Sequence, residues 1–170
     1  MDRTIGRLIN GQKSRDIIEN SNILLVSDHG MASISSDSMI FLDDYINMDD
    51  VMMVDWTPVA ALRPKGNVEL IYDKLKNAHP KMSVYKKGAA PMRLHYNNHR
   101  RIQPITAIAH ENWSISTRTI FNKGDNPKLY DGGTHGYDQK YQSMGGVFVA
   151  HGPAFKQGMN GPSISNIHLY

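Results

Sequence analysis

Four aliphatic residues in a row, Ile-Leu-Leu-Val at positions 23–26, constrain the fold of this chain more than any other feature. An unbroken apolar run of this kind predicts a strand buried on both faces, which is typical of a parallel sheet covered by helices. Asp28 and His29 follow the run almost at once, and Gly30 then lets the backbone turn away. Because ligands of open α/β sheets bind beyond the carboxyl ends of the strands, the sequence predicts an α/β fold with functional side chains at this strand end.

Asp28 and His29 are candidate metal ligands, since an ionised carboxylate and a neutral imidazole both suit zinc. The chain contains no cysteine, so disulfides and cysteine-based zinc sites are excluded, and any zinc must be held by histidines and carboxylates. The structural alternative is that Asp28 caps the junction between strand and loop beside a hydrogen-bonded His29. The two residues alone leave both interpretations open.

The length and charge of the chain limit its class. Its 170 residues are enough for one domain with a hydrophobic core. The net charge of +3 comes from scattered Lys and Arg, so we expect no binding to duplex nucleic acid, whereas an anionic small molecule suits this balance. No stretch approaches the roughly 20 consecutive apolar residues of a membrane span, and the first residues lack the apolar core of a signal peptide.

The order of expected elements favours an α/β fold with a β-rich insertion. Apolar residues at helical spacing predict a helix near the start of the chain, and Asn67 is expected to cap a second helix that ends before Pro80. Residues 104–110 and 113–120 are expected to form a β pair joined by a tight turn at Glu111 and Asn112. Further strands are expected at residues 38–41, 51–55, 59–62, 82–85 and 145–150.

His135 is the third candidate ligand, and it lies in a Gly-Gly-Thr-His-Gly segment. Glycines on both sides free the backbone to approach a ligand closely. Three protein ligands plus water is the composition of a catalytic zinc site, so Asp28, His29 and His135 together could hold one zinc. The alternative is an ordinary glycine-rich turn with an exposed histidine, because spacing along the sequence does not show whether the three residues meet.

Other candidates for chemistry are weaker. His95 lies beside aromatic and basic residues, so either contact with a substrate or a structural role is expected. Ser27 precedes Asp28 and His29, but no Gly-x-Ser-x-Gly segment surrounds it. A hydrolase of the Ser-His-Asp type is therefore not expected.

Taken in order, several segments resemble the ectonucleotide pyrophosphatase/phosphodiesterase family of the alkaline phosphatase superfamily. The segments are NILLVSDHGM at 22–31, PMRLHY at 91–96, RIQPI at 101–105, GTHGYD at 133–138 and AHGPAFK at 150–156. They extend over nearly the whole chain, and their shared order makes the resemblance specific.

The resemblance implies a phosphodiesterase with two Zn²⁺ per complete catalytic domain. In that family a threonine attacks phosphorus, and the phospho-threonine intermediate is then hydrolysed. The residues matching Asp28 and His29 bind the zinc that also holds the threonine, and the residue matching His135 binds the other zinc. The substrates it implies are small phosphodiesters, either nucleotides or lysophospholipids and choline esters. The implied location is extracellular or membrane-anchored.

The resemblance also implies that this chain is only part of such a domain. The nucleophilic threonine and the other three zinc ligands are expected before Met1, and Gln139 stands where the family commonly has Asn. Residues 1–170 are thus expected to form the C-terminal half of the catalytic domain. The expected fold is a partial alkaline-phosphatase-like sandwich, with a mixed sheet flanked by helices and a small β-rich insertion.

Two alternatives remain open beside this interpretation. The chain could be a catalytically inactive half-domain or a truncated gene product without hydrolase activity. Asp28, His29 and His135 could instead serve a single-metal hydrolase. By itself the chain is expected to lack activity, because each zinc would have too few protein donors.

Overall fold

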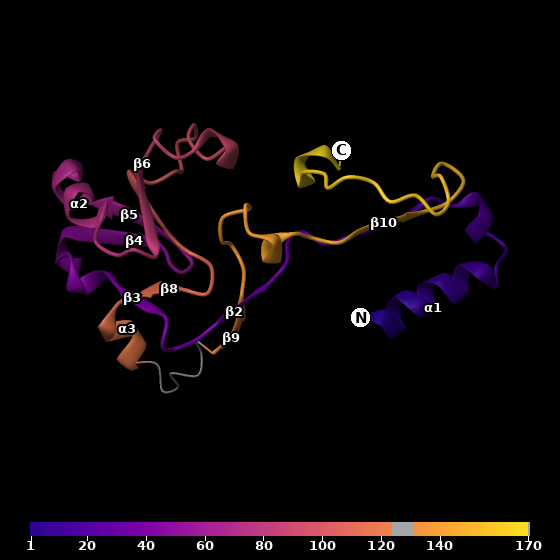
Figure 1. Cartoon of the computed structure of the whole chain (residues 1–170), viewed down its shortest axis with the longest axis horizontal. Coiled ribbons are helices and arrows are strands. Elements are labelled where there is room, and N and C mark those ends of the chain that lie inside the picture. Colours follow the sequence, from indigo (N-terminus) through magenta and orange to yellow (C-terminus); the bar gives the residue numbers. More distant parts are fainter. Residues whose placement is uncertain (124–130, 170) are drawn as a thin grey trace. The chain divides into compact units, whose positions relative to one another are not determined.

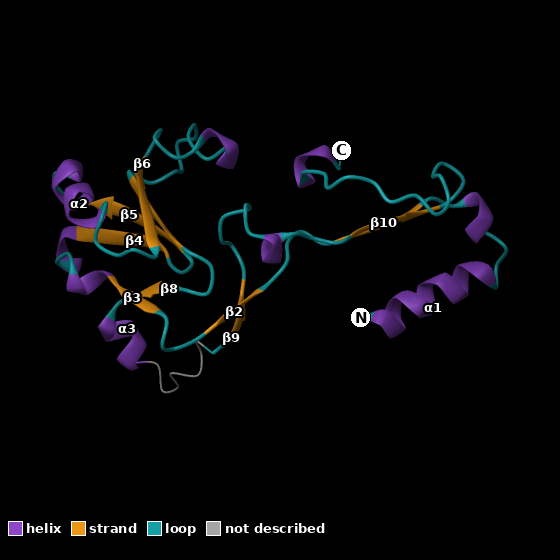
Figure 2. Ribbon diagram, viewed as in Figure 1, coloured by secondary structure: helices purple, strands orange, loops and turns teal. Residues whose placement is uncertain are grey.

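The computed structural model describes residues 1–123 and 131–169 and divides the chain into two compact units. The terminal unit consists of residues 1–29 and the described residues from 146 onward, and the central unit consists of the described residues between 30 and 145. The fold is mixed α/β with several small sheets (Figures 1 and 2). In the described ranges no helix is long and apolar enough to cross a bilayer.

A four-stranded antiparallel sheet forms the framework of the central unit. Its order is β4-β5-β7-β6, with bounds Val51–Asp55 for β4, Val59–Pro64 for β5, Ile105–Ala109 for β7 and Met82–Lys86 for β6. Helix α2, Val68–Leu75, packs on β5 and β6 (Figure 1). The predicted strands at 51–55, 59–62 and 82–85 and the predicted helix after Asn67 are therefore confirmed.

Alternation of apolar residues explains how this sheet builds the core. Leu62 lies opposite Ile105, and Val84 lies opposite Ala107, so these side chains share one face of the sheet. Ile71 and Leu75 of α2 belong to the same buried cluster. Leu62, Leu75 and Ile105 are fully buried, which places the centre of the core between this face and α2.

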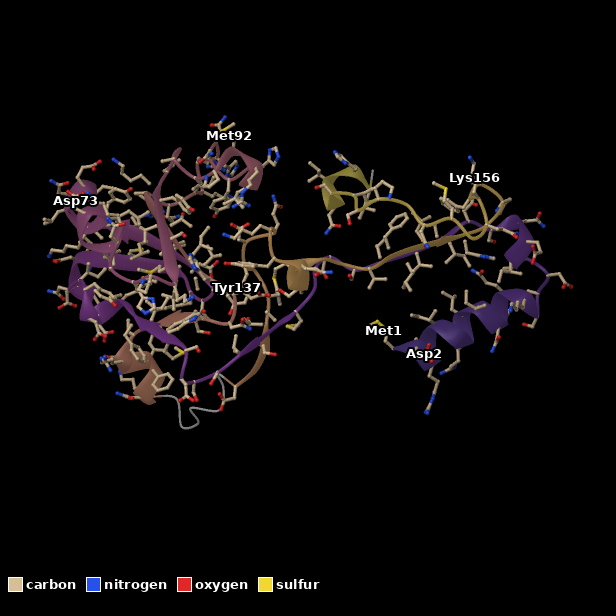
Figure 3. The ribbon with its side chains drawn as sticks, viewed as in Figure 1. Met1, Asp2, Asp73, Met92, Tyr137 and Lys156 are labelled. Carbon is tan, nitrogen blue, oxygen red and sulfur yellow. The ribbon has the colours of Figure 1, made fainter. Side chains whose placement is uncertain are left out.

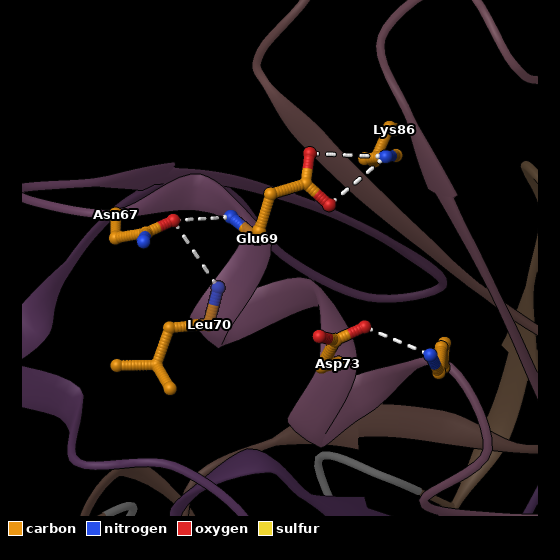
Figure 4. A network of polar contacts seen from close by, with 6 residues as sticks. Asn67, Glu69, Leu70, Asp73 and Lys86 are labelled. Carbon is orange, nitrogen blue, oxygen red and sulfur yellow. Dashed lines mark hydrogen bonds and ion pairs between the residues drawn. The ribbon is translucent and has the colours of Figure 1, made fainter.

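Asn67 caps α2 as the sequence predicts. Its Oδ1 accepts hydrogen bonds from the backbone N–H of Glu69 at 2.9 Å and of Leu70 at 3.4 Å (Figure 4). The carboxylate of Glu69 in turn accepts two 3.0 Å bonds from Nζ of Lys86 on β6. The start of the helix is thus satisfied by a side chain and tied to the sheet.

Removing this cap gives a first testable prediction. Asn67→Ala is expected to lower the free energy of unfolding of the central unit by about 1 kcal/mol, because two backbone donors lose their acceptor. Urea unfolding followed by tryptophan fluorescence measures the change. Asn67→Asp keeps an acceptor at the same position and should retain nearly all of the stability; an equal loss in both variants would contradict the role of the cap.

The predicted pairing of residues 104–110 with 113–120 is wrong. Strand β7 is flanked by β5 and β6, so neither of its edges is open to the segment that follows it. Asn112 takes a left-handed turn with φ of 70°, and β8, Ser114–Ser116, then pairs in parallel with β3, Met39–Phe41. The chain continues as helix α3, Arg118–Lys123, because Thr117 Oγ1 accepts the Ile120 N–H at 3.2 Å.

The described part of the central unit contains one further pair of strands. Strand β2, Ala32–Ile34, pairs in antiparallel orientation with β9, Gly132–Thr134. Short 3-10 helices in the chain occupy Ile18–Asn20, Leu42–Asp44, Met48–Asp50, Met92–Leu94, Gln142–Met144 and Asn166–His168.

The terminal unit contains helix α1, Asp2–Lys13, and a two-stranded ribbon of β1, Ile23–Val26, with β10, Phe148–His151. The predicted first helix and both strands are present, but the environment predicted for β1 is wrong. The strand is antiparallel to β10, and Leu24 and Val26 are 50% and 45% exposed. Within the described residues β1 pairs with β10 alone, and three of its four residues are exposed.

Candidate functional site

Asp28 and His29 lie just past the end of β1 in the terminal unit. The ladder with β10 is prolonged by Ser27, whose N–H donates to the Val147 carbonyl at 3.0 Å and whose Oγ accepts from the Val147 N–H at 2.7 Å. The backbone leading to Asp28 is therefore fixed, and Asn166 Nδ2 donates to the Asp28 carbonyl at 2.6 Å. The sequence places these two residues at a strand end, and the structure confirms that position.

The Asp28 carboxylate accepts a backbone hydrogen bond, as the capping interpretation predicts. Its Oδ1 accepts the backbone N–H of His29 at 3.0 Å, and its Oδ2 lies 3.5 Å from His29 Nε2. The Asp28 side chain is 86% exposed and that of His29 33%. The pair is thus prearranged at the surface of its unit, with a carboxylate and an imidazole side by side.

Gly30 is required by a close approach of two backbone segments. Its N–H donates to the Met144 carbonyl at 3.0 Å, and a Cβ at this position would collide with the backbone carbonyl of Ser143. Any larger residue would displace the segment around Ser143. The glycine that follows His29 is therefore explained by packing within the central unit.

His135 lies at the surface of the central unit, directly after β9. On its N-terminal side Thr134 pairs with Ala32 in the β2–β9 ladder. On its C-terminal side Gly136 has a φ of +100°, and a Cβ there would lie 3.3 Å from Pro58 Cγ. Glycine at 136 therefore allows a turn that other residues adopt only with strain.

Tyr137, labelled in Figure 3, anchors this loop to the core. Its side chain is only 5% exposed, and its hydroxyl donates to the Trp113 carbonyl at 2.8 Å. Burial raises the pKa of Tyr137 to about 12. The exposed His135 imidazole thus follows a fixed strand and precedes a fixed aromatic ring.

The sequence prediction does not include the residues that position the loop. The chemistry of its side chain makes His135 a candidate ligand, whereas the supporting roles of Tyr137, Asp138 and Trp113 appear only in the structure. One feature of the sequence points to Tyr137: it is a large aromatic residue inside an otherwise polar, glycine-rich segment, which often marks a contact with the core.

The three predicted ligands divide between the two units. Asp28 and His29 belong to the terminal unit and His135 to the central unit. Their donor atoms are of the kind that zinc accepts, but across residues 1–123 and 131–169 no three His, Asp or Glu side chains form a metal-binding group. The chain therefore does not supply a complete zinc site in the described ranges, and the ligand assignment stays a prediction.

Comparison with known proteins identifies the family. The model of the family "Type I phosphodiesterase / nucleotide pyrophosphatase" matches residues 1–138. The chain is 39% identical over 171 residues to human ectonucleotide pyrophosphatase/phosphodiesterase family member 5, covering 100% of this chain and 34% of the relative. It is 41% identical over 170 residues to the bis(5'-adenosyl)-triphosphatase ENPP4 of Bos taurus, covering 100% of this chain and 36% of the relative.

Solved structures agree with the sequence relatives. Human ENPP5 superimposes with a TM-score of 0.80 at 40% identity, covering 89% of this chain and 39% of the other. The murine protein, solved as an inactive variant in complex with AMP, gives the same values.

The chain spans about a third of the length of these curated relatives. The similarity nevertheless extends over its own full length, and the family model covers 138 of its 170 residues. The resemblance found in the sequence motifs is thereby confirmed, and the chain belongs to the type I phosphodiesterase/nucleotide pyrophosphatase family.

Proposed function

We propose that this chain forms the C-terminal part of a catalytic domain that hydrolyses phosphodiester or pyrophosphate bonds in nucleotides. The observation that carries the proposal is 41% identity, over the whole chain, to a relative named as a bis(5'-adenosyl)-triphosphatase. The AMP bound to an inactive murine relative supports a nucleotide rather than a lipid substrate. The net charge of +3 is compatible with an anionic substrate.

In this proposal Asp28 and His29 hold one zinc and His135 holds a second. A bound zinc would supply a Lewis acid and lower the pKa of a coordinated water. The protein's own contribution is to hold its donors in place: the ladder through Ser27 fixes the backbone before Asp28, and Tyr137 fixes the loop after His135. The complete domain would have the sandwich architecture of the alkaline phosphatase superfamily. In this proposal its nucleophilic threonine belongs to another part of that domain and not to the segments of this chain that resemble the family.

An extracellular or membrane-anchored location is part of the same proposal, because the human relative is named an ectonucleotide enzyme. The second candidate is a half-domain without hydrolase activity. It is compatible with the same observation as the first proposal: the described residues bring no three metal-binding side chains together.

A chimera tests the proposal. The chain would replace the matched 170 residues of the bovine bis(5'-adenosyl)-triphosphatase, and hydrolysis of bis(5'-adenosyl) triphosphate would be measured with zinc content. We expect a zinc-containing, active chimera. Replacing a proposed ligand by His135→Ala should lower kcat/KM by at least about 100-fold, because ligand loss exceeds the effect of losing a supporting residue.

His99→Ala provides the matched control, since it removes another exposed histidine of the central unit and should leave activity unchanged. A soluble, folded chimera without turnover would overturn the proposal and favour the inactive half-domain. Equal losses in the two histidine variants would overturn the assignment of His135.

A further inference from the structure

Arg93 makes a two-pronged ion pair with Asp138, three residues after His135. Nη1 of Arg93 donates to Asp138 Oδ1 at 2.5 Å and Nη2 donates to Oδ2 at 2.6 Å. Parallel bonds of this kind fix direction as well as distance, which a single charge contact does not. The Asp138 side chain is only 12% exposed, so most of the carboxylate is withdrawn from water.

Two neighbouring contacts complete the attachment. Gln139 Nε2 donates to the backbone carbonyl of Arg93 at 2.6 Å, so consecutive residues hold both the side chain and the backbone of Arg93. The backbone N–H of Lys140 donates to Asp138 Oδ1 at 3.0 Å. This bond orients the carboxylate from within the same loop. The Arg93 guanidinium holds the pKa of Asp138 below its usual range, so this carboxylate is ionised at neutral pH.

The partner segment is remote in sequence. Arg93 lies in the 3-10 helix Met92–Leu94, and Asp138 follows it 45 positions further along the chain. The loop that carries His135 is therefore held at three places: by the β2–β9 ladder before it, by Tyr137 in the core, and by Arg93 at Asp138. We propose that Arg93 is a positioning residue for His135, acting through Asp138 and assisted by Gln139.

The exposure of Arg93 limits the effect of the ion pair to the nearby loop. An ion pair whose arginine is 44% exposed contributes little to global stability because water screens it. It can still restrict the loop, since the clamped Asp138 follows His135 by only three residues. Lysine at 93 would keep the charge but lose the fork geometry that binds both oxygens.

The test measures order of the loop in this chain without requiring activity. Hydrogen exchange of the backbone amides at residues 134–136 is expected to be about ten-fold faster in Arg93→Ala, because local opening of the loop becomes easier. The urea midpoint of the central unit should stay unchanged. Arg93→Lys should restore part of the protection, and Gln139→Asn, which shortens the side chain by one methylene, should give a smaller loss.

Arg118→Ala is the matched control. Arg118 makes an equivalent two-pronged pair with Asp44, with both bonds at 2.7 Å, in the same unit. Its loss should leave exchange at residues 134–136 unchanged. Unchanged exchange in Arg93→Ala, or an equal rise in both variants, would overturn the proposal.

The link to zinc rests on the proposed function and has its own readout. In the chimera, Arg93→Ala is expected to lower zinc affinity, measured by competition with a chelator, by about 10- to 100-fold, as is usual for groups that orient a metal ligand. Faster exchange in the chain alongside a chimera that binds no zinc would uphold the clamp and reject the metal site. Normal exchange in a zinc-binding chimera would reject the clamp and leave the proposed function intact.

Discussion

Leu62→Ala is expected to lower the free energy of unfolding of the central unit by about 2–5 kcal/mol. Leu62 is fully buried and lies opposite Ile105 at the centre of the four-stranded sheet. The substitution removes apolar contacts and leaves a cavity that the surrounding side chains fill only in part. Both tryptophans, Trp56 and Trp113, lie in this unit, so their fluorescence during urea unfolding reports on it directly.

Leu70→Ala is the matched control for this prediction. Leu70 lies on α2, is 55% exposed, and loses the same atoms on substitution. Its cost should be below about 1 kcal/mol, because surface substitutions rarely cost more. Similar costs at both positions would show that the burial pattern described for the sheet is wrong.

Raising the pH from 10 to 12 is expected to cost the central unit about 2 kcal/mol through Tyr137 alone. Burial raises the pKa of this phenol from 10.0 to about 12 in the folded protein. Between these values the unfolded chain releases the proton while the folded chain retains it, so stability is full below pH 10 and falls as the pH rises. Urea unfolding at a series of alkaline pH values measures the slope.

Tyr137→Phe isolates this contribution from the other tyrosines. At neutral pH the variant should be less stable by about 1 kcal/mol, because the Trp113 carbonyl loses its donor. It should also lack the titration, so the two stability curves are expected to cross at about pH 11. Parallel curves from pH 10 to 12 would contradict a buried, hydrogen-bonded Tyr137.

The predictions for Leu62 and Tyr137 both concern the packing between the core and the His135 loop. Tyr137 belongs to the buried cluster that contains Leu62, and it lies two residues after His135. Packing of the core therefore helps to determine where the candidate ligand is held. Weakening that packing is therefore expected to make the His135 loop less ordered without altering the imidazole itself.

Much of the local structure could be predicted from the sequence, because it depends on neighbouring residues. Asn67 caps α2 through donors two and three residues ahead, and alternation at 82–85 matches β6. The position of Asp28 and His29 at a strand end follows in the same way from the apolar run that precedes them.

Partners of the strands could not be predicted so well. Residues 105–109 and 114–116 are both strands, but the edges of β7 are taken by β5 and β6, and β8 therefore pairs with β3. The apolar run at 23–26 predicts a strand whose two faces are buried by other elements. Its exposure in the described structure depends on which elements lie beside it, and that is a property of the assembled chain.

The sequence by itself determined the family, the strand end that carries Asp28 and His29, and the glycine-flanked loop that carries His135, because these depend on residue type and order. Only the tertiary structure revealed what holds that loop. Arg93 reaches Asp138 across 45 residues and Tyr137 reaches the Trp113 carbonyl across 24. Contacts between such distant segments arise only when the sheet has formed, since the entropy of closing each loop is offset by burial of the whole core.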